Sequence, residues 1–362
     1  MAKRRRTASW AQAFQRSFAA LARGGLLVGA RAPGRAAGTP KAGSRRASPG
    51  SRSASPGSRR ASPGDGQGIP GIALGSAGAR RYRLYRPPGL KFGERLPLLL
   101  MLHGCDQDAK RFAASTRMNG VAARERFFVL YVEQDRLSNP QGCWNWFGTN
   151  SRRAYGEAAL IVNALDQACL LYPVDRARVA IAGLSAGASM AALLATRYPE
   201  RFKALAMHSG IPPGTAHSTL SALGAMHGRR ATQPLPAAPP TNPWPPLLVI
   251  HGSNDAVVSP RNGRAAAEAW AAAAGARPAA VRVVQRGARY PMTVTDFKRR
   301  GTIAATLVEV AGLGHAWSGG ATGQAFSDPR GPDGSRLVWA FAARQFREQA
   351  RAAAESQVIT LA

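Results

Sequence analysis

The chain has 362 residues, of which 45% are hydrophobic and 19% charged, a composition that excludes a disordered polyelectrolyte, a collagen and a disulfide-stapled mini-protein. It has no run of about 18 apolar residues, so we expect no membrane-spanning helix. The formal net charge of +30 suggests a polyanionic partner, although an arginine-rich coding composition would produce the same bias.

The first 68 residues differ in composition from the rest of the chain. They hold 14 basic residues and one acid, Asp65, among many glycines, prolines and serines. Three tandem units, 44–50, 51–57 and 58–64, each read Ser-Arg-x-Ala-Ser-Pro-Gly, and proline with glycine in every unit forbids a helical heptad repeat. We predict a mostly disordered basic tail over 1–68, which could contact anionic surfaces but has no specific nucleic-acid site.

The start of the chain matches only part of a secretory signal. The basic residues of 3–6 fit, but Gln12 and Arg16 interrupt the segment that should be apolar. Three cysteines leave one odd thiol after any single disulfide, and whether Cys105 and Cys143 form one is left open. These features do not decide whether the protein is exported.

From about residue 80, short apolar runs alternate with longer alanine-rich stretches. The runs favour strands over 82–85, 98–102, 127–132, 179–182 and 247–250. The stretches favour helices over 109–126, 156–172, 186–198 and 264–274. Alternation of this kind predicts an α/β fold, a mostly parallel sheet with helices on both faces. We expect one catalytic domain over 69–349, followed by a C-terminal tail over 350–362.

The strongest local signal is the motif Gly-Leu-Ser-Ala-Gly at 183–187. It directly follows a strand-like run and directly precedes a helix-like stretch. A sharp strand-to-helix turn has room only for small neighbours, and it projects the hydroxyl of Ser185 above the carboxyl edge of the sheet. The context therefore predicts that Ser185 is a nucleophile.

A serine nucleophile needs a histidine to take its proton and a carboxylate to orient that histidine. In this kind of fold the acid precedes the histidine along the chain. His315, in the segment 312–317 after a strand-like run, is the predicted base. Asp255, which also follows a strand-like run, is the predicted acid, with Asp296 as its competitor. His251 lies four residues before Asp255, and we expect it to shape that loop.

The oxyanion that forms during ester cleavage must meet fixed hydrogen-bond donors. We expect one from the backbone N–H of Ala186, which begins a helix and gains from the helix dipole. The second should come from the loop after the strand 98–102, where we assign the N–H of Cys105.

Tryptophans near these motifs are candidates for contact with substrate. Trp144 and Trp146 fall in the aromatic segment 143–147, which fits core packing and a binding wall equally well. Trp317 lies two residues from His315 and is the better candidate for lining the acyl pocket.

Four blocks of sequence, 101–105 with Gln107, 143–147, 183–187 and 314–320, together resemble the poly(3-hydroxybutyrate) depolymerase family of esterases. The resemblance implies an α/β-hydrolase fold, a Ser185, Asp255 and His315 triad, an oxyanion hole near Cys105, and hydrolysis of hydroxyalkanoate esters. It also suggests an extracellular protein.

Relatives that share these blocks include feruloyl and acetylxylan esterases, so the resemblance fixes the reaction better than the substrate. The expected function is that of a serine esterase without metal or cofactor. Its expected substrates are poly- or oligo-3-hydroxybutyrate or related short-chain hydroxyacyl esters. A feruloyl, acetylxylan or general short-chain carboxylesterase is the alternative. An alternative of another class is a protein that binds granules or polyanions through its basic tail.

Overall fold

The computed structural model describes residues 66–232 and 243–361. The predicted basic tail lies outside the described residues up to position 65. The first six strands and the helices among them are β1 (Gln67–Gly75), β2 (Gly78–Arg86), β3 (Leu96–Leu102), α2 (Ala109–Thr116), α3 (Met118–Glu125), β4 (Phe128–Val132), α4 (Arg153–Leu171), β5 (Val174–Leu184), α5 (Ala186–Arg197), a 3-10 turn at Pro199–Arg201 and β6 (Ala204–His208). The remaining elements are α6 (Thr219–Met226), β7 (Leu247–Gly252), α7 (Pro260–Ala274), β8 (Arg277–Pro278), β9 (Arg282–Val284), β10 (Met292–Arg299), β11 (Thr302–Val310), β12 (Trp317–Ser318), β13 (Ser327–Asp328) and α8 (Gly334–Leu361).

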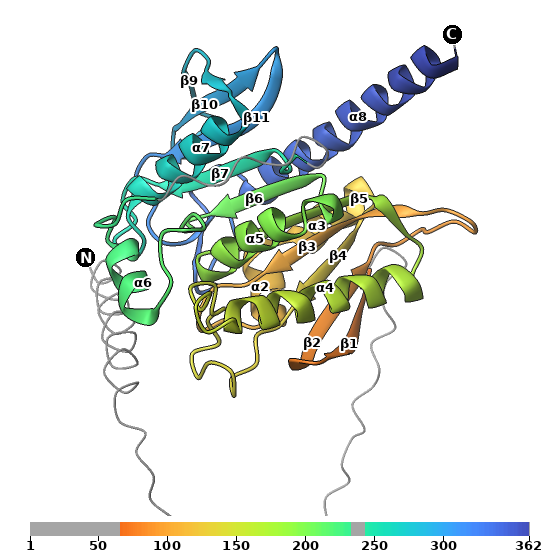
Figure 1. Ribbon diagram of the computed structural model, residues 1–362, viewed down its shortest axis with the longest axis horizontal. Helices are drawn as coiled ribbons and strands as arrows, with labels where there is room; N and C mark the ends of the chain where they lie inside the picture. Colours follow the sequence, from red (N-terminus) through yellow and green to blue (C-terminus); the bar gives the residue numbers. More distant parts are fainter. Residues whose placement is uncertain (1–65, 233–242, 362) are drawn as a thin grey trace, which may run out of the picture.

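In the part of the chain that the structure describes, eleven strands form one sheet (Figure 1). Their order is β1-β2-β4-β3-β5-β6-β7-β11-β10-β8, with β9 beside β10. The six strands from β4 to β11 in this order run parallel, whereas hairpins at both ends are antiparallel. Because the central strands are parallel, the loops that follow them meet at one edge of the sheet.

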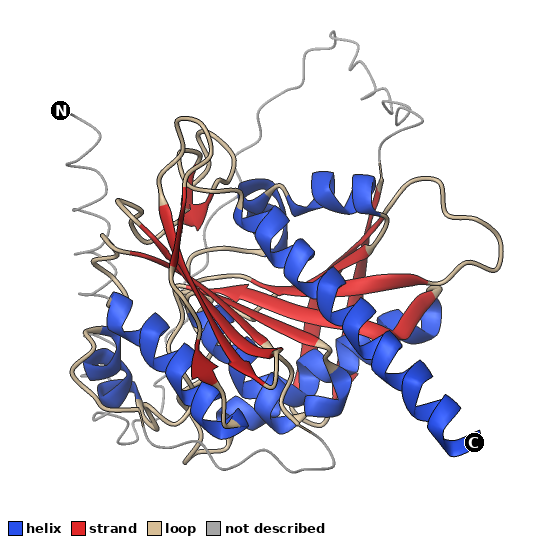
Figure 2. Ribbon diagram, turned by 90° about the horizontal axis from the view of Figure 1, so that it is seen from above, coloured by secondary structure: helices blue, strands red, loops and turns tan. Residues whose placement is uncertain are grey.

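Helices cover both faces of this sheet (Figure 2). Alternate residues of β3 show the division, since Leu98 and Leu100 pack in a core with α4, α5 and α7. Leu99 and Met101 pack in a second core with α2, α3 and α8. Every residue of β3 is buried, as expected for a strand covered on both sides. The predicted α/β fold with a mostly parallel sheet is confirmed.

Several helical segments differ from the sequence-based expectation, including α6, which lies where no helix was expected. The helix expected over 109–126 is divided into α2 and α3 at Arg117, whose φ of 55° lies in the left-handed region. The N–H of Arg117 bonds the carbonyl of Ala113 and thereby ends α2. Helix α8 runs to Leu361 without a break at residue 349, where the sequence places the end of the domain.

None of the helices within the described residues is both long and apolar enough to cross a membrane.

Candidate active site

Ser185 occupies the turn between β5 and α5, with φ 56° and ψ −121°. Few residues other than glycine adopt a positive φ of this kind, and such strain persists only where surrounding contacts enforce it. Here the Ser185 N–H donates to the carbonyl of His208 at 2.9 Å, and the Ser185 carbonyl accepts from the N–H of Ser189 at 3.1 Å. The turn is therefore held from both sides.

Glycines beside the serine allow close backbone contacts. A Cβ atom on Gly187 would lie 2.2 Å from the carbonyl oxygen of Leu102, and one on Gly183 would lie 2.4 Å from the backbone of Gly187. A Cβ atom on Gly104 would lie 3.6 Å from the Cβ of Ser185. The loop after β3 therefore lies directly beside Ser185.

His315 and Asp255 meet at the same edge of the sheet. The Nδ1 atom of His315 lies 2.8 Å from Oδ2 of Asp255. The side chain of Asp255 is fully buried, and its Oδ1 accepts the N–H groups of Val257 at 3.0 Å and Val258 at 2.8 Å. Both carboxylate oxygens therefore have donors, and the side chain is fixed by its own loop.

A second histidine supports Asp255. The Nε2 atom of His251, near the end of β7, lies 3.0 Å from the carbonyl of Val258 and 3.4 Å from Oδ2 of Asp255. Because a carbonyl oxygen only accepts, this nitrogen carries the proton. Helix α7 covers the opposite side of the ring, where a Cβ on Gly263 would lie 2.6 Å from Nδ1 of His251.

The pKa of Asp255 reflects opposing effects. Burial is the largest single effect and raises this pKa. The attraction of His315 and the hydrogen bonds from His251 and His315 together lower it by more than burial raises it, so the net pKa falls below its usual range. Asp255 is therefore an anion at neutral and mildly acidic pH, and His315 donates Nδ1–H to it. This leaves Nε2 of His315 as the basic nitrogen of the ring.

Asp296, the competing acid, has other partners. It lies on β10, where its Oδ1 accepts from the hydroxyl of Thr306 at 2.7 Å and its Oδ2 accepts from the guanidinium of Arg282 at 2.6 Å. The structure thus pairs His315 with Asp255 and engages Asp296 at a different position.

The loop after β3 is held by a disulfide and by side chains. Cys105 forms a disulfide with Cys143, with Cα atoms 4.3 Å apart. The N–H of Gly104 donates to Oε1 of Gln107 at 3.0 Å. Among the described residues, the N–H groups of Cys105 and Ala186 have no acceptor. Two unused donors thus lie on the two loops that meet at the elbow.

A buried histidine, His103, anchors the same loop. Its Nε2 accepts the N–H of Gln134 at 3.1 Å, and its Nδ1 lies 2.8 Å from the carbonyl of Gly104. Burial lowers the pKa of His103 to about 4, so the ring is neutral and Nδ1 donates to the Gly104 carbonyl. The ring also contacts Trp144, with centroids 5.6 Å apart.

The three tryptophans expected to contact substrate are buried. Trp144 and Trp317 are 0% exposed and Trp146 is 7% exposed. The Trp317 indole N–H donates to the hydroxyl of Ser335 at 3.1 Å, and its ring stacks on His208 with centroids 5.0 Å apart. In this structure Trp144 and Trp317 offer no face to a ligand because core contacts surround them.

His208, which the sequence-based assignment leaves without a role, joins the elbow to the His315 loop. Besides accepting the Ser185 N–H at its carbonyl, it accepts the N–H of Ser318 at Nε2, at 3.0 Å. Burial lowers the pKa of His208 to about 3, so its ring is neutral. No sequence motif marks it, because its role depends on a contact with a segment 110 residues away.

The hydroxyl of Ser185 has no hydrogen-bond partner within the described residues. Ser185 and His315 follow β5 and β11, which run in the same direction, so both lie at the carboxyl edge of the sheet. Hydrogen bonds between a nucleophile and its base are often long until substrate binds.

The model of the family "Esterase PHB depolymerase" matches residues 80–285, more than half of the chain. Poly(3-hydroxyalkanoate) depolymerase C of Paucimonas lemoignei is 33% identical over 177 residues, which cover 46% of this chain and 42% of that protein. Feruloyl esterase B of Neurospora crassa is 26% identical over 203 residues, which cover 52% of this chain and 68% of that protein.

Acetylxylan esterase of Coprinopsis cinerea is 29% identical over 195 residues, or 49% of this chain and 50% of that protein. The chain thus spans about half the length of the curated relatives it matches. Among solved structures, the acetyl xylan esterase from Aspergillus awamori has a TM-score of 0.55 at 19% identity, covering 70% of this chain and 94% of that one. This likeness supports the α/β-hydrolase fold. By its sequence and fold, the chain belongs to the Esterase PHB depolymerase family, a family of carboxylic ester hydrolases.

Proposed function

We propose that the protein hydrolyses carboxylic esters with Ser185 as nucleophile, His315 as general base and Asp255 as the group that orients His315. The observation that carries this proposal is the 2.8 Å contact between Nδ1 of His315 and Oδ2 of Asp255. It lies at the edge of the sheet where Ser185 adopts its strained backbone. One catalytic domain, from β1 to α8, contains the three residues.

The reaction proceeds through an acyl-enzyme. Ser185 Oγ attacks the ester carbonyl while Nε2 of His315 accepts the hydroxyl proton and then passes it to the leaving alcohol. Water, deprotonated by the same nitrogen, attacks the acyl-enzyme and releases the acid and free Ser185. The N–H groups of Ala186 and Cys105 donate to the oxyanion in both steps.

The proposed substrates are poly- or oligo-3-hydroxybutyrate or related short-chain hydroxyacyl esters. Support comes from the family and from the poly(3-hydroxyalkanoate) depolymerase, which is 33% identical, compared with 26% and 29% for the feruloyl and acetylxylan esterases. The disulfide between Cys105 and Cys143 supports an oxidising, extracellular site of action. Trp146, which retains a small exposed fraction, remains the proposed tryptophan contact with substrate.

A substrate panel tests this proposal, with Ser185→Ala as the blank. The panel contains p-nitrophenyl esters from acetate to octanoate, 3-hydroxybutyrate oligomers, amorphous polyester granules, methyl ferulate and acetylated xylan. The expected result is hydrolysis of oligomers or granules that the variant lacks. Hydrolysis confined to ferulate or acetylxylan would assign another substrate to the same triad. Equal hydrolysis by the variant would overturn the assignment of Ser185.

A further inference from the structure

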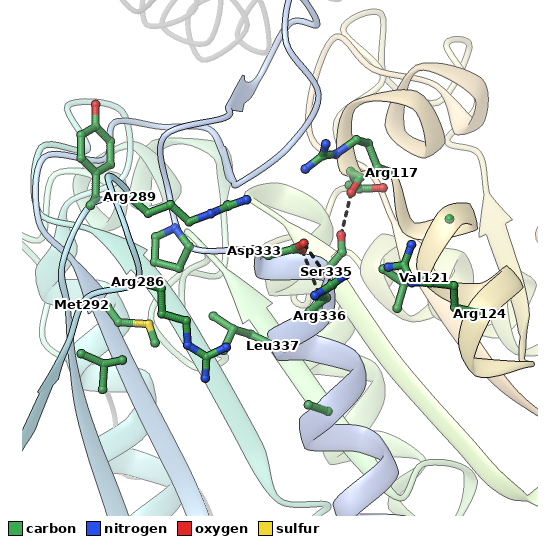
Figure 3. A pocket seen from close by; sticks show the side chains of 16 residues that line it. Arg117, Val121, Arg124, Arg286, Arg289, Met292, Asp333, Ser335, Arg336 and Leu337 are labelled. Carbon is green, nitrogen blue, oxygen red and sulfur yellow. Dashed lines mark hydrogen bonds and ion pairs between the residues drawn. The ribbon is translucent and has the colours of Figure 1, made fainter.

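A cavity of about 590 Å³ lies apart from the triad, between α3, the start of α8 and the loop that leads into β10 (Figure 3). Three segments that are distant in sequence, within 116–124, 284–292 and 332–340, form its walls. Ser185, Asp255 and His315 are not among its lining residues. The cavity is therefore a separate site on the molecule.

Positive charge dominates this cavity, which we call the arginine pocket. All three wall segments contribute to its five arginines, which are Arg117, Arg124, Arg286, Arg289 and Arg336. Its lining holds one acid, Asp333. Figure 3 shows the side chains of Arg117 and Arg289 extending toward one another from opposite walls. A concave wall of one charge sign focuses the electrostatic potential and attracts counter-ions.

Most guanidinium donors in the arginine pocket have no hydrogen-bond partner among the described residues. Arg117 gives one hydrogen bond to the carbonyl of Gly319 at 2.7 Å, and Arg289 gives one to the carbonyl of Gly331 at 2.7 Å. A guanidinium carries five N–H donors, so each keeps several for a ligand. These backbone contacts also fix the two side chains in place.

The remaining arginines have still fewer partners. Arg336 lies 3.6 Å from the carboxylate of Asp333, whereas Arg124 and Arg286 make no side-chain hydrogen bond or ion pair with any residue that the structure describes. A bound anion would reduce the mutual repulsion of these cations. A monovalent anion would pair with one guanidinium and leave the remaining guanidinium groups without an anionic partner.

We propose that the arginine pocket binds a small multivalent anion with at least two phosphate or carboxylate groups. Guanidinium groups match these planar or tetrahedral oxyanions with paired N–H donors. The apolar side chains of Val121, Met292 and Leu337 in the same lining would contact the carbon skeleton of an organic anion. The proposal does not depend on which ester the triad hydrolyses.

Calorimetric titration with pyrophosphate and, separately, citrate tests the proposal on the full chain at about 0.15 M salt, where exposed charges are screened. The pocket variant combines Arg124→Gln with Arg286→Gln, two changes that remove no side-chain hydrogen bond or ion pair between described residues. The matched control combines Arg81→Gln with Arg83→Gln, two exposed arginines of β2 that remove the same charge elsewhere. The control accounts for general attraction to a chain of net charge +30.

The expected result is saturable binding that the pocket variant weakens at least tenfold and the control leaves unchanged. Binding of pyrophosphate alone would identify a phosphate site, and binding of citrate alone a carboxylate site. Absence of saturable binding, or equal weakening in both variants, would overturn the proposal. Hydrolysis of p-nitrophenyl acetate checks that the pocket variant is folded.

If the pocket variant does not fold, Ala340→Glu provides an independent test. Ala340 is exposed on α8 within the lining, and a carboxylate there would compete with the anion for the guanidinium groups. Binding should weaken at least tenfold in this variant also. Unchanged binding would contradict the proposal.

Discussion

The Nδ1 atom of His315 lies 2.8 Å from Oδ2 of Asp255, although the two residues are 60 positions apart. Sheet pairing explains the contact, since β7 and β11 are parallel neighbours in which Val249 pairs with Leu307. The loops that follow both strands consequently emerge side by side. Oδ2 accepts a hydrogen bond from Nδ1–H, which fixes the tautomer in which Nε2 of His315 carries no proton and, in the proposed mechanism, accepts the proton of Ser185.

Replacement of the acid tests this arrangement. Asp255→Asn should lower kcat for p-nitrophenyl acetate by about 10³- to 10⁴-fold, because an amide cannot stabilise the imidazolium or hold the required tautomer. The control is Asp296→Asn, which removes an ion pair with the exposed Arg282 and should change kcat little. A kcat for Asp255→Asn close to that of the wild type would show that another group orients His315.

The disulfide should affect both stability and activity. Replacing Cys105 and Cys143 together by alanine frees a segment of 38 residues, and the free energy of unfolding should fall by about 3 kcal/mol. The N–H of Cys105 would also lose its fixed position, so we expect kcat to fall about tenfold. Urea unfolding and ester hydrolysis measure the two effects. Cys169→Ala, at the free buried cysteine, controls for loss of a thiol and should retain kcat. Full kcat in the double variant would exclude Cys105 as a fixed donor.

Two buried histidines should make stability depend on pH. Burial lowers the pKa of His208 to about 3 and that of His103 to about 4, from 6.5. Below pH 6.5 the unfolded chain binds protons at these positions that the folded chain does not, so the free energy of unfolding falls as pH falls. Each histidine should contribute about 1.4 kcal/mol per pH unit between its unfolded and folded pKa values.

Urea unfolding between about pH 6 and about pH 4.5 measures this dependence. His208→Gln keeps an acceptor for the N–H of Ser318 but does not titrate. The slope of its free energy of unfolding against pH should therefore be smaller than that of the wild type by the contribution of one proton. The exposed-loop change Ser253→Ala is the control and should leave the slope unchanged. A slope in His208→Gln equal to that of the wild type would mean that His208 is protonated in the folded protein.

Close packing at the elbow should make one glycine irreplaceable. In Gly187→Ala the new Cβ would lie 2.2 Å from the Leu102 carbonyl oxygen, a backbone atom within the sheet that cannot move aside. We expect the free energy of unfolding to fall by about 3 kcal/mol or more. Ala188→Gly, one position further along α5, should cost only about 1 kcal/mol. Equal stabilities of the two variants, measured by thermal and urea unfolding, would contradict the close contact.

Central strands such as β3 and β5 could be predicted from sequence because they are continuous apolar runs. The central strand β6 was not among the predicted strands, and neither were the edge strands. Strand β1 contains Pro70 and several glycines, and most of its residues are exposed or half-buried. An edge strand tolerates this composition, which in sequence resembles the preceding tail. The break between α2 and α3 at Arg117 could not be predicted from sequence either, because no proline or glycine marks it. A tertiary contact instead holds that residue, through the hydrogen bond from its guanidinium to Gly319.

Chain order predicted that Asp255 and His315 would serve the same site, because α/β folds place the acid and base on loops after successive strands. The sequence could not distinguish tryptophans of the core from tryptophans that line a binding site, since both kinds occur in apolar segments beside a motif. Burial of Trp144 and Trp317 depends on how distant segments pack. The bridging position of His208 depends likewise on its contact with Ser318.

The role of Ser185 as nucleophile is tested most directly by covalent labelling with an alkyl fluorophosphonate, followed by peptide mass spectrometry. We predict one adduct per chain on Ser185, with loss of ester hydrolysis in proportion to labelling and no adduct in Ser185→Ala. An adduct on another residue, or ester hydrolysis that survives in Ser185→Ala, would contradict the proposed mechanism.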